Sequence, residues 1–218
     1  MARRSCLVFV PAGADASVKS TAGTWVVVLI KDLDSAKQRL GPVLDPNARR
    51  ALARQNAELA IRAAAAGDRR LVVAGSPEVV AIAEQLGAEA LLEPRQEGQN
   101  EAAMRGIAHA VKSGARAVLL LSSDLPLVTR AAVRELLEVA GRAAPPVALA
   151  VPALGRGGTN ALYLNPPDAI SLHFGADSLA AFRREAEASG VNFATHGSEA
   201  MALDLDEPAD LAHPRRAV

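Results

Sequence analysis

The chain has 218 residues, of which 50% are hydrophobic and 22% are charged, a composition typical of a soluble globular protein with one sizeable core. Its 24 basic and 24 acidic residues cancel, so the net charge argues against nucleic-acid and membrane partners. A single cysteine, Cys6, excludes an intrachain disulfide and fits a reducing cytoplasm. Aromatic residues make up only 3% of the chain, which leaves a small molecule as the expected partner.

Residues 1–24 are predicted to form a disordered leader. Residues 11–24 are small and polar, without a periodicity that could bury one face of a helix or strand. A single folded domain is therefore expected over residues 25–213.

From Trp25 onward, short β-branched runs alternate with longer segments of helical spacing, which indicates repeated strand and helix units. Strands are predicted at residues 25–30, 71–74, 90–92, 117–121, 147–151 and 191–194. Helices are predicted at about residues 47–66, 77–86, 99–112, 129–140 and 178–189. The unbroken apolar run at 117–121 indicates a central strand covered on both faces. The fold class is therefore α/β, with a mostly parallel central sheet flanked by helices.

Three cations directly follow the first predicted strand. Ligands of an open α/β sheet bind beyond the carboxyl ends of its strands, so polar residues there are the first candidates for a site. Lys31, Lys37 and Arg39 occupy such a position and could neutralise a triphosphate. No phosphate-binding glycine motif accompanies these three cations. The alternative to a triphosphate site is a basic loop that is simply exposed to solvent.

Acidic residues occur at two other candidate positions. Asp124 ends the central strand, where a carboxylate can hold Mg²⁺ against substrate phosphates. Its alternative role is to cap the next helix, although Thr129 is better placed to do so. Near the C-terminus, alternation along an extended segment points Asp204 and Asp206 to the same side, from which both could meet Asp124 through a metal. Spacing alone leaves Asp206 undecided between metal binding and helix initiation, and Asp210 is expected to cap.

Two glycine-rich segments are candidates for anion binding. Residues 155–160 follow a strand and contain enough glycine for backbone N–H groups to approach an anion. Residues 173–178 end at Ser178, at a predicted helix N-terminus that favours phosphate or carboxylate. Each segment alone also fits a turn with a cap, but the pair predicts a site for a small anionic ligand.

Six segments taken in order resemble one family, the guanylyltransferases of coenzyme F420 biosynthesis, which act as 2-phospho-L-lactate or phosphoenolpyruvate guanylyltransferases. The segments are Lys31 with residues 36–40, then residues 97–100, 123–126, 157–162, 174–178 and 204–211. The resemblance extends over about residues 25–211. The segments at 123–126 and 157–162 are less widely shared than the first, which other nucleotidyltransferase-like families also carry.

The resemblance implies a single nucleotidyltransferase domain of the glycosyltransferase-A type. It implies a Mg²⁺-dependent transfer of GMP from GTP to the phosphate of phosphoenolpyruvate, 2-phospho-L-lactate or 3-phosphoglycerate, with release of pyrophosphate. The partners would be GTP and a small phosphorylated carboxylic acid; a homodimer is one option, and the oligomeric state stays open. The alternatives are a nucleotidyltransferase for another phosphorylated metabolite, such as a sugar phosphate, and a non-catalytic nucleotide-binding sensor.

The resemblance also implies roles for individual residues. The metal ligands would be Asp124, Asp204 and Asp206, which assigns Asp206 to the metal. The GTP phosphates would face the catalytic cations Lys31, Lys37 and Arg39. The acid substrate would be bound largely by backbone amides at Thr159, Gly175 and Ser178, with Gly158 alongside. The nucleoside would lie near Gly75, Ser76, Gly98 and Asn100.

Two positions depart from the family pattern. Gln99 stands where leucine usually precedes the asparagine, and Phe182 stands where a histidine usually follows the serine by four residues. Phe182 therefore indicates either an altered acid preference or a core contact.

Overall fold

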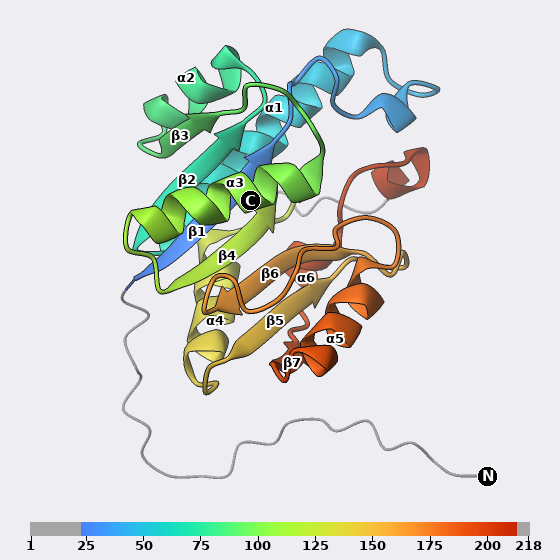
Figure 1. Cartoon of the computed structure of the whole chain (residues 1–218). Helices are drawn as coiled ribbons and strands as arrows, with labels where there is room; N and C mark the ends of the chain where they lie inside the picture. Colours follow the sequence, from blue (N-terminus) through green and yellow to red (C-terminus); the bar gives the residue numbers. More distant parts are fainter. Residues whose placement is uncertain (1–22, 213–218) are drawn as a thin grey trace, which may run out of the picture.

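The computed structural model describes residues 23–212, in which a seven-stranded sheet lies between two layers of helices (Figure 1). Nearly all of the leader predicted at residues 1–24, Cys6 included, lies outside these described residues. Thr24, which we assigned to the leader, is the first residue of strand β1.

The chain forms every strand and helix that the sequence predicts, with small differences at their ends, and adds a strand at residues 159–165 and a short helix at residues 199–202 that were not predicted. The strands are β1 (Thr24–Ile30), β2 (Arg69–Ala74), β3 (Glu89–Leu92), β4 (Ala117–Ser122), β5 (Val147–Pro152), β6 (Thr159–Asn165) and β7 (Asn192–Thr195). The α-helices are α1 (Pro46–Ala63), α2 (Pro77–Gln85), α3 (Gln99–Lys112), α4 (Arg130–Gly141), α5 (Ser178–Ala188) and α6 (Glu199–Ala202). Short 3-10 helices are η1 (Gln38–Leu40), η2 (Ala64–Ala66) and η3 (Pro208–Ala212). Within residues 23–212, no helix is both long and apolar enough to cross a bilayer.

The sheet has the order β3-β2-β1-β4-β6-β5-β7. Its neighbouring strands are parallel except that β6 runs antiparallel to both β4 and β5. The prediction of a mostly parallel sheet flanked by helices is therefore confirmed. All seven residues of β1 are buried, because helices cover both faces of the strand.

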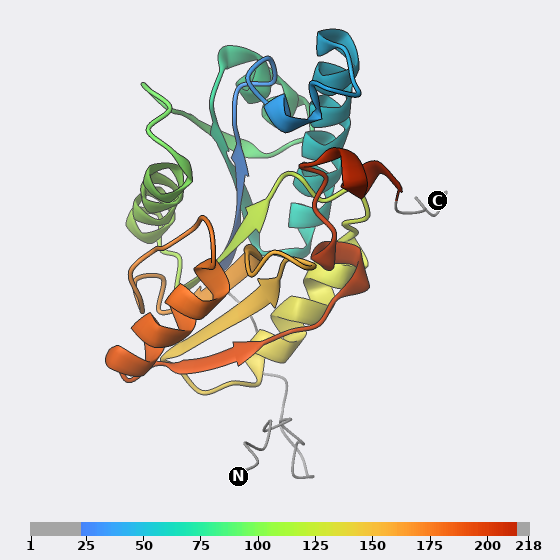
Figure 2. The ribbon, with the colours of Figure 1, turned by 90° about the vertical axis from the view of Figure 1, so that its right-hand side faces the viewer.

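The helices divide into two layers (Figures 1 and 2). Helices α1, α2 and α4 pack on one face of the sheet, and α3 and α5 pack on the other. Gly106 allows α3 to approach the sheet closely, since a Cβ atom there would lie 2.6 Å from Cγ1 of Val27. The Oγ1 of Thr129 accepts a hydrogen bond from the N–H of Ala132 and so caps α4, as the sequence predicts.

Candidate active site

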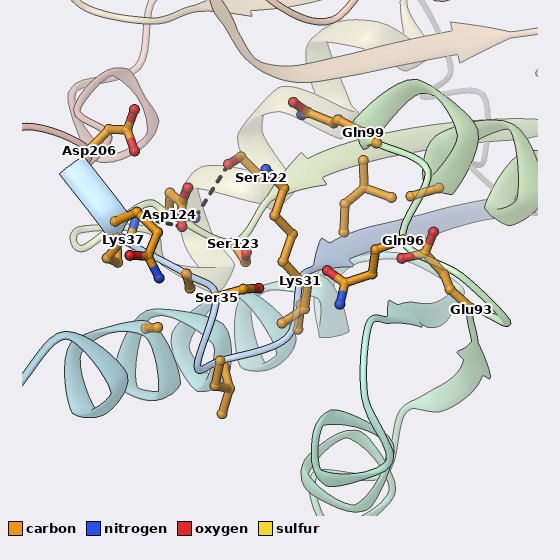
Figure 3. Close-up of a pocket in the computed structure, with 18 of the residues that line it drawn as sticks. Lys31, Ser35, Lys37, Glu93, Gln96, Gln99, Ser122, Ser123, Asp124 and Asp206 are labelled. Carbon is orange, nitrogen blue, oxygen red and sulfur yellow. Dashed lines mark hydrogen bonds and ion pairs between the residues drawn. The ribbon is translucent and has the colours of Figure 1, made fainter. Parts of the chain in front are cut away.

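A cleft of about 540 Å³ opens at the carboxyl ends of the central strands (Figure 3). The carboxyl ends of parallel strands meet at one edge of the sheet, and this edge is where such folds bind ligands. The cleft is lined by residues 29–39, 93–102 and 122–124 in part, together with Asp206. All three predicted catalytic cations, Lys31, Lys37 and Arg39, belong to this lining.

The C-terminal segment closes one end of the cleft. The N–H of Leu205 donates a 3.0 Å hydrogen bond to the carbonyl oxygen of Asp124, which brings the segment against the end of β4. The side chains of Asp124 and Asp206 both line the cleft. Arg39 approaches from the opposite wall, with its Nη1 2.7 Å from Oδ2 of Asp206.

Lys37 differs from the other two cations because its side chain is only 1% exposed. Its Nζ lies 2.6 Å from Oδ1 of Asp124 and donates a 2.5 Å hydrogen bond to the carbonyl of Leu205. A left-handed backbone with φ 58° at Lys37 accompanies this inward orientation. Lys37 therefore holds Asp124 and the C-terminal segment in place, whereas Lys31 and Arg39 are exposed at the cleft.

Asp204, the third predicted metal ligand, does not line the cleft and pairs instead with Arg156. Nη1 of Arg156 lies 3.1 Å from Oδ2 of Asp204, and its Nη2 bonds the carboxylate of Asp210. Burial raises the pKa of Asp204, an effect that Arg156 opposes and that the charges of Asp210 and Asp124 reinforce.

Asp210 closes the turn before η3, in agreement with its predicted capping role. Its Oδ2 accepts hydrogen bonds from the backbone N–H groups of Asp206 and Glu207. Burial acts to raise the pKa of Asp210, but these bonds and the one from Arg156 outweigh burial and lower that pKa.

The three predicted metal carboxylates are not gathered around one point. Each has a cationic partner, and within residues 23–212 no group of three His, Cys, Asp or Glu side chains is arranged to hold an ion. Nucleotide sites, however, commonly hold Mg²⁺ by one or two carboxylates, with water and substrate phosphates completing the shell. Asp124 and Asp206, which share the cleft, fit that mode of binding better than a closed site of three carboxylates.

The two glycine-rich segments meet, as the anion-site prediction requires. Oγ of Ser178 donates a 3.1 Å hydrogen bond to Oγ1 of Thr159, and both residues are buried. The N–H of Leu179 donates to the carbonyl of Gly157, where a Cβ atom would lie 2.9 Å from Oδ1 of Asp177. The two loops thus form one unit at the N-terminus of α5.

The remaining predicted acid-binding residues are the two glycines of this unit. Gly158 directly precedes Thr159, and Gly175 has φ 138°, a conformation suited to glycine. The carbonyl of Gly175 accepts a 3.3 Å hydrogen bond from the N–H of Ser178. Whether these four residues bind an acid stays a prediction.

The four predicted nucleoside residues have different surroundings. Gly98 lines the cleft, but Gly75 and Ser76 do not. Gly75 instead packs under the end of β1, where a Cβ atom would lie 2.6 Å from the backbone N of Asp32. Ser76 precedes α2 at its N-cap position.

Asn100 does not line the cleft, but it directly follows the lining residue Gln99 and contacts the loop that leads to Ser178. Its Oδ1 accepts a 2.8 Å hydrogen bond from the N–H of Phe174, and its Nδ2 donates a 3.2 Å bond to the carbonyl of the same residue. The amide side chain is thereby directed to the backbone of residue 174.

The two departures from the family pattern also have different surroundings. Gln99 lines the cleft as the first residue of α3. Phe182 is fully buried, with its ring 5.1 Å from that of Phe174. Of the two interpretations of Phe182, the structure therefore shows the core contact.

Glu93 and Gln96 are polar cleft residues that were absent from the sequence prediction. Glu93 follows β3 and is 9% exposed. Gln96 donates from Nε2 to the carbonyl of Gly75 at 3.3 Å and accepts at Oε1 from the N–H of Asp32 at 3.4 Å. Like Asp124, Glu93 follows the end of a strand, but no residue of β3 is buried, so the apolar pattern that singles out Asp124 does not single out Glu93.

Known proteins resemble the chain over most of its length. Residues 24–213 match the family model described as guanylyl transferase CofC like. The phosphoenolpyruvate guanylyltransferase of Rubrobacter xylanophilus is 43% identical over 192 residues, covering 86% of this chain and 91% of that protein. The 2-phospho-L-lactate guanylyltransferase of Methanothermobacter thermautotrophicus is 32% identical over 189 residues, covering 86% and 82%. A solved nucleotidyl transferase from Methanothermobacter has the same fold, with a TM-score of 0.62, 16% identity, and coverage of 87% and 94%.

Proposed function

Because the chain belongs to the family of CofC-like guanylyl transferases, we propose that it transfers GMP from GTP to the phosphate of a three-carbon phospho-acid in coenzyme F420 biosynthesis. Pyrophosphate is the second product. One feature of the structure supports this reaction above others: residues 98–99 line the cleft with its exposed cations and two carboxylates, and the next residue, Asn100, bonds the loop that leads to the buried Ser178 and Thr159. This link supports binding of a triphosphate in the cleft and of a small acid at the adjoining loops.

The cleft residues have complementary roles in this proposal. Lys31 and Arg39 offset the negative charge of the triphosphate, since both are exposed on the lining. Lys37, which is buried, positions Asp124 through the ion pair between its Nζ and the carboxylate. Asp124 and Asp206 would hold Mg²⁺, which supplies charge neutralisation at the phosphates and at the leaving pyrophosphate.

The reaction is a direct displacement at phosphorus. A phosphate oxygen of the acid attacks the α-phosphorus of GTP; the new P–O bond forms as the bond to the β-phosphate bridging oxygen breaks, and pyrophosphate leaves with that electron pair. Phosphate is already a nucleophile, so the step needs no activated Ser or Cys. The chain contributes by holding the two anions together, with the acid at the backbone of the Thr159 and Ser178 loops.

The test is pyrophosphate release with GTP and Mg²⁺, measured with phosphoenolpyruvate, 2-phospho-L-lactate and 3-phosphoglycerate in separate reactions. We expect release with at least one acid, together with a guanylated product of the expected mass. Release without any acid, or silence with all three from folded protein that binds GTP, would contradict the proposed reaction.

Asp124→Asn tests the metal-binding end of the cleft. We expect it to lower kcat at least 100-fold in Mg²⁺ because a cleft carboxylate is lost, an effect on the scale of other electrostatic groups in active sites. Asp168→Asn is the matched control, since Asp168 is exposed and outside the cleft lining. Thermal unfolding of both variants separates loss of activity from loss of folding, and full activity of Asp124→Asn would exclude the metal role.

A further inference from the structure

Glu93 is a buried acidic residue at the end of the cleft opposite to Asp124. It follows β3, and its backbone N–H donates a 2.9 Å hydrogen bond to the carbonyl of Ala74, which fixes the position of the residue. The side chain lines the cleft, and Figure 3 shows it extending toward Gln96. Its Oε1 is buried and has no hydrogen-bond partner among the described residues.

A buried carboxylate oxygen without a partner is costly, because it has lost water and gained no donor in exchange. This cost appears as a raised pKa of Glu93, caused first by burial and opposed by the charge of Arg105. Arg105 forms no hydrogen bond or ion pair with Glu93: its Nη2 bonds the carboxylate of Glu97, and its Nε is itself buried without a partner among the described residues. A ligand that brings N–H donors into the cleft would supply the missing partner.

The position of Glu93 favours the base over the phosphates as that ligand group. Figure 3 places Asp124 and Asp206 on one side of Lys31, and Gln96 and Glu93 on the other. Phosphates would bind at the end with the exposed cations, where Arg39 lies beside Asp206. A nucleotide bound in that direction extends its base toward Glu93.

We propose that Glu93 determines the base specificity of the cleft by accepting hydrogen bonds from the N1–H and the exocyclic amine of guanine. This inference rests on the proposed function, which it deepens. Guanine presents two adjacent N–H donors on one edge, and an ionised carboxylate is an acceptor only. Adenine presents an acceptor at N1 beside its amine, so it would place a lone pair against the carboxylate and leave Glu93 unsatisfied.

Equilibrium binding of GTP, ITP and ATP to the unmodified protein tests the proposal without a variant. ITP retains the N1–H of guanine but lacks the exocyclic amine. We expect the affinity for ITP to be about 10- to 100-fold lower than that for GTP, the discrimination usual for a bidentate contact to a base, and the affinity for ATP to be lower still. Calorimetry with each nucleotide in the absence of any acid substrate gives these ratios. Equal binding of GTP and ITP would overturn the role of Glu93.

Glu93→Gln tests the residue itself. The amide keeps one acceptor oxygen but sets its NH2 group against the second donor of guanine, so we expect weaker GTP binding and a GTP-to-ITP ratio close to one. Glu101→Gln is the matched control, because Glu101 is exposed on α3 outside the cleft lining, and its ratio should match that of the unmodified protein. If Glu93→Gln proves unstable, Glu93→Asp is the substitute variant. It preserves the negative charge, so it should retain a preference for GTP over ATP. An unchanged ratio in Glu93→Gln would overturn the proposal.

The results distinguish this inference from the proposed function. If the protein releases pyrophosphate with GTP and an acid but Glu93→Gln retains the guanine preference, guanylyl transfer stands and the base contact is wrong. If no nucleotide binds to the folded protein, both are wrong.

Discussion

Lys31 and Lys37 lie six positions apart in one segment but have opposite environments. Lys37 is buried against Asp124 and Leu205, while Lys31 is exposed on the cleft lining. We expect Lys37→Met to lower the free energy of unfolding by about 1–3 kcal/mol, because two hydrogen bonds to a charged group are lost, and to reduce kcat through misplacement of Asp124. Denaturation in urea and steady-state kinetics measure the two effects.

Lys31→Met is the comparison for that variant. Its unfolding free energy should stay within about 0.5 kcal/mol of the unmodified protein, as for most exposed positions. Loss of one charge-assisted contact should instead raise the KM for GTP about tenfold. If Lys37→Met behaves like Lys31→Met, both lysines contact GTP and the positioning role of Lys37 is wrong.

The sequence predicts which segments reach the cleft better than it predicts the contacts of single side chains within them. The sequence places Lys37 and Arg39 beyond β1, but it does not show that Lys37 turns inward, because that depends on the carbonyl of Leu205 in the distant C-terminal segment. Asp204 likewise meets Arg156 rather than the cleft. Contacts between distant segments decide each of these roles, and no local pattern encodes them.

At the scale of elements, Asn100 ties the N-terminus of α3 to the backbone of Phe174, in the loop that leads to Ser178 and that we propose to bind the acid. We predict that Asn100→Leu raises the KM for the acid about 3- to 10-fold, the effect of losing hydrogen bonds of ordinary strength, and leaves the KM for GTP unchanged. Asn192→Leu, at an exposed residue, is the matched control. A raised KM for GTP with an unchanged KM for the acid would instead place Asn100 at the nucleoside.

The sequence predicts elements well where the apolar pattern is strong. The buried runs of β1, β4 and β5 and the five longer helices were located within a few residues of their ends. Strand β6 was not among the predicted strands, and its direction is not encoded locally, since a strand buried on both faces has the same apolar pattern whichever way it runs. The segment at residues 203–206 was expected to be extended, and its hydrogen bond to Asp124 fixes which wall of the cleft it joins.

At the scale of the whole molecule, the cleft joins parts of the chain that are far apart in sequence. Lys37 and Leu205 are separated by 168 positions, and Arg39 and Asp206 by 167. A nucleotide in the cleft contacts only the folded arrangement of these segments, so binding must stabilise the fold as a unit. At 100 times its Kd, GTP should add about 2.7 kcal/mol to the free energy of unfolding.

For a chain of this length, that increase corresponds to a rise in Tm of roughly 5–10 °C, measurable by calorimetry or circular dichroism. ATP at the same concentration should give a smaller rise, since adenine has an acceptor at N1 and so lacks the pair of adjacent donors that Glu93 would bind. Guanosine is the control for the contribution of the phosphates to the rise in Tm. It carries the base but lacks the negative charge that Lys31 and Arg39 neutralise, so its rise should be smaller than that with GTP. An unchanged Tm at GTP concentrations that saturate turnover would mean that the nucleotide does not bind across these segments.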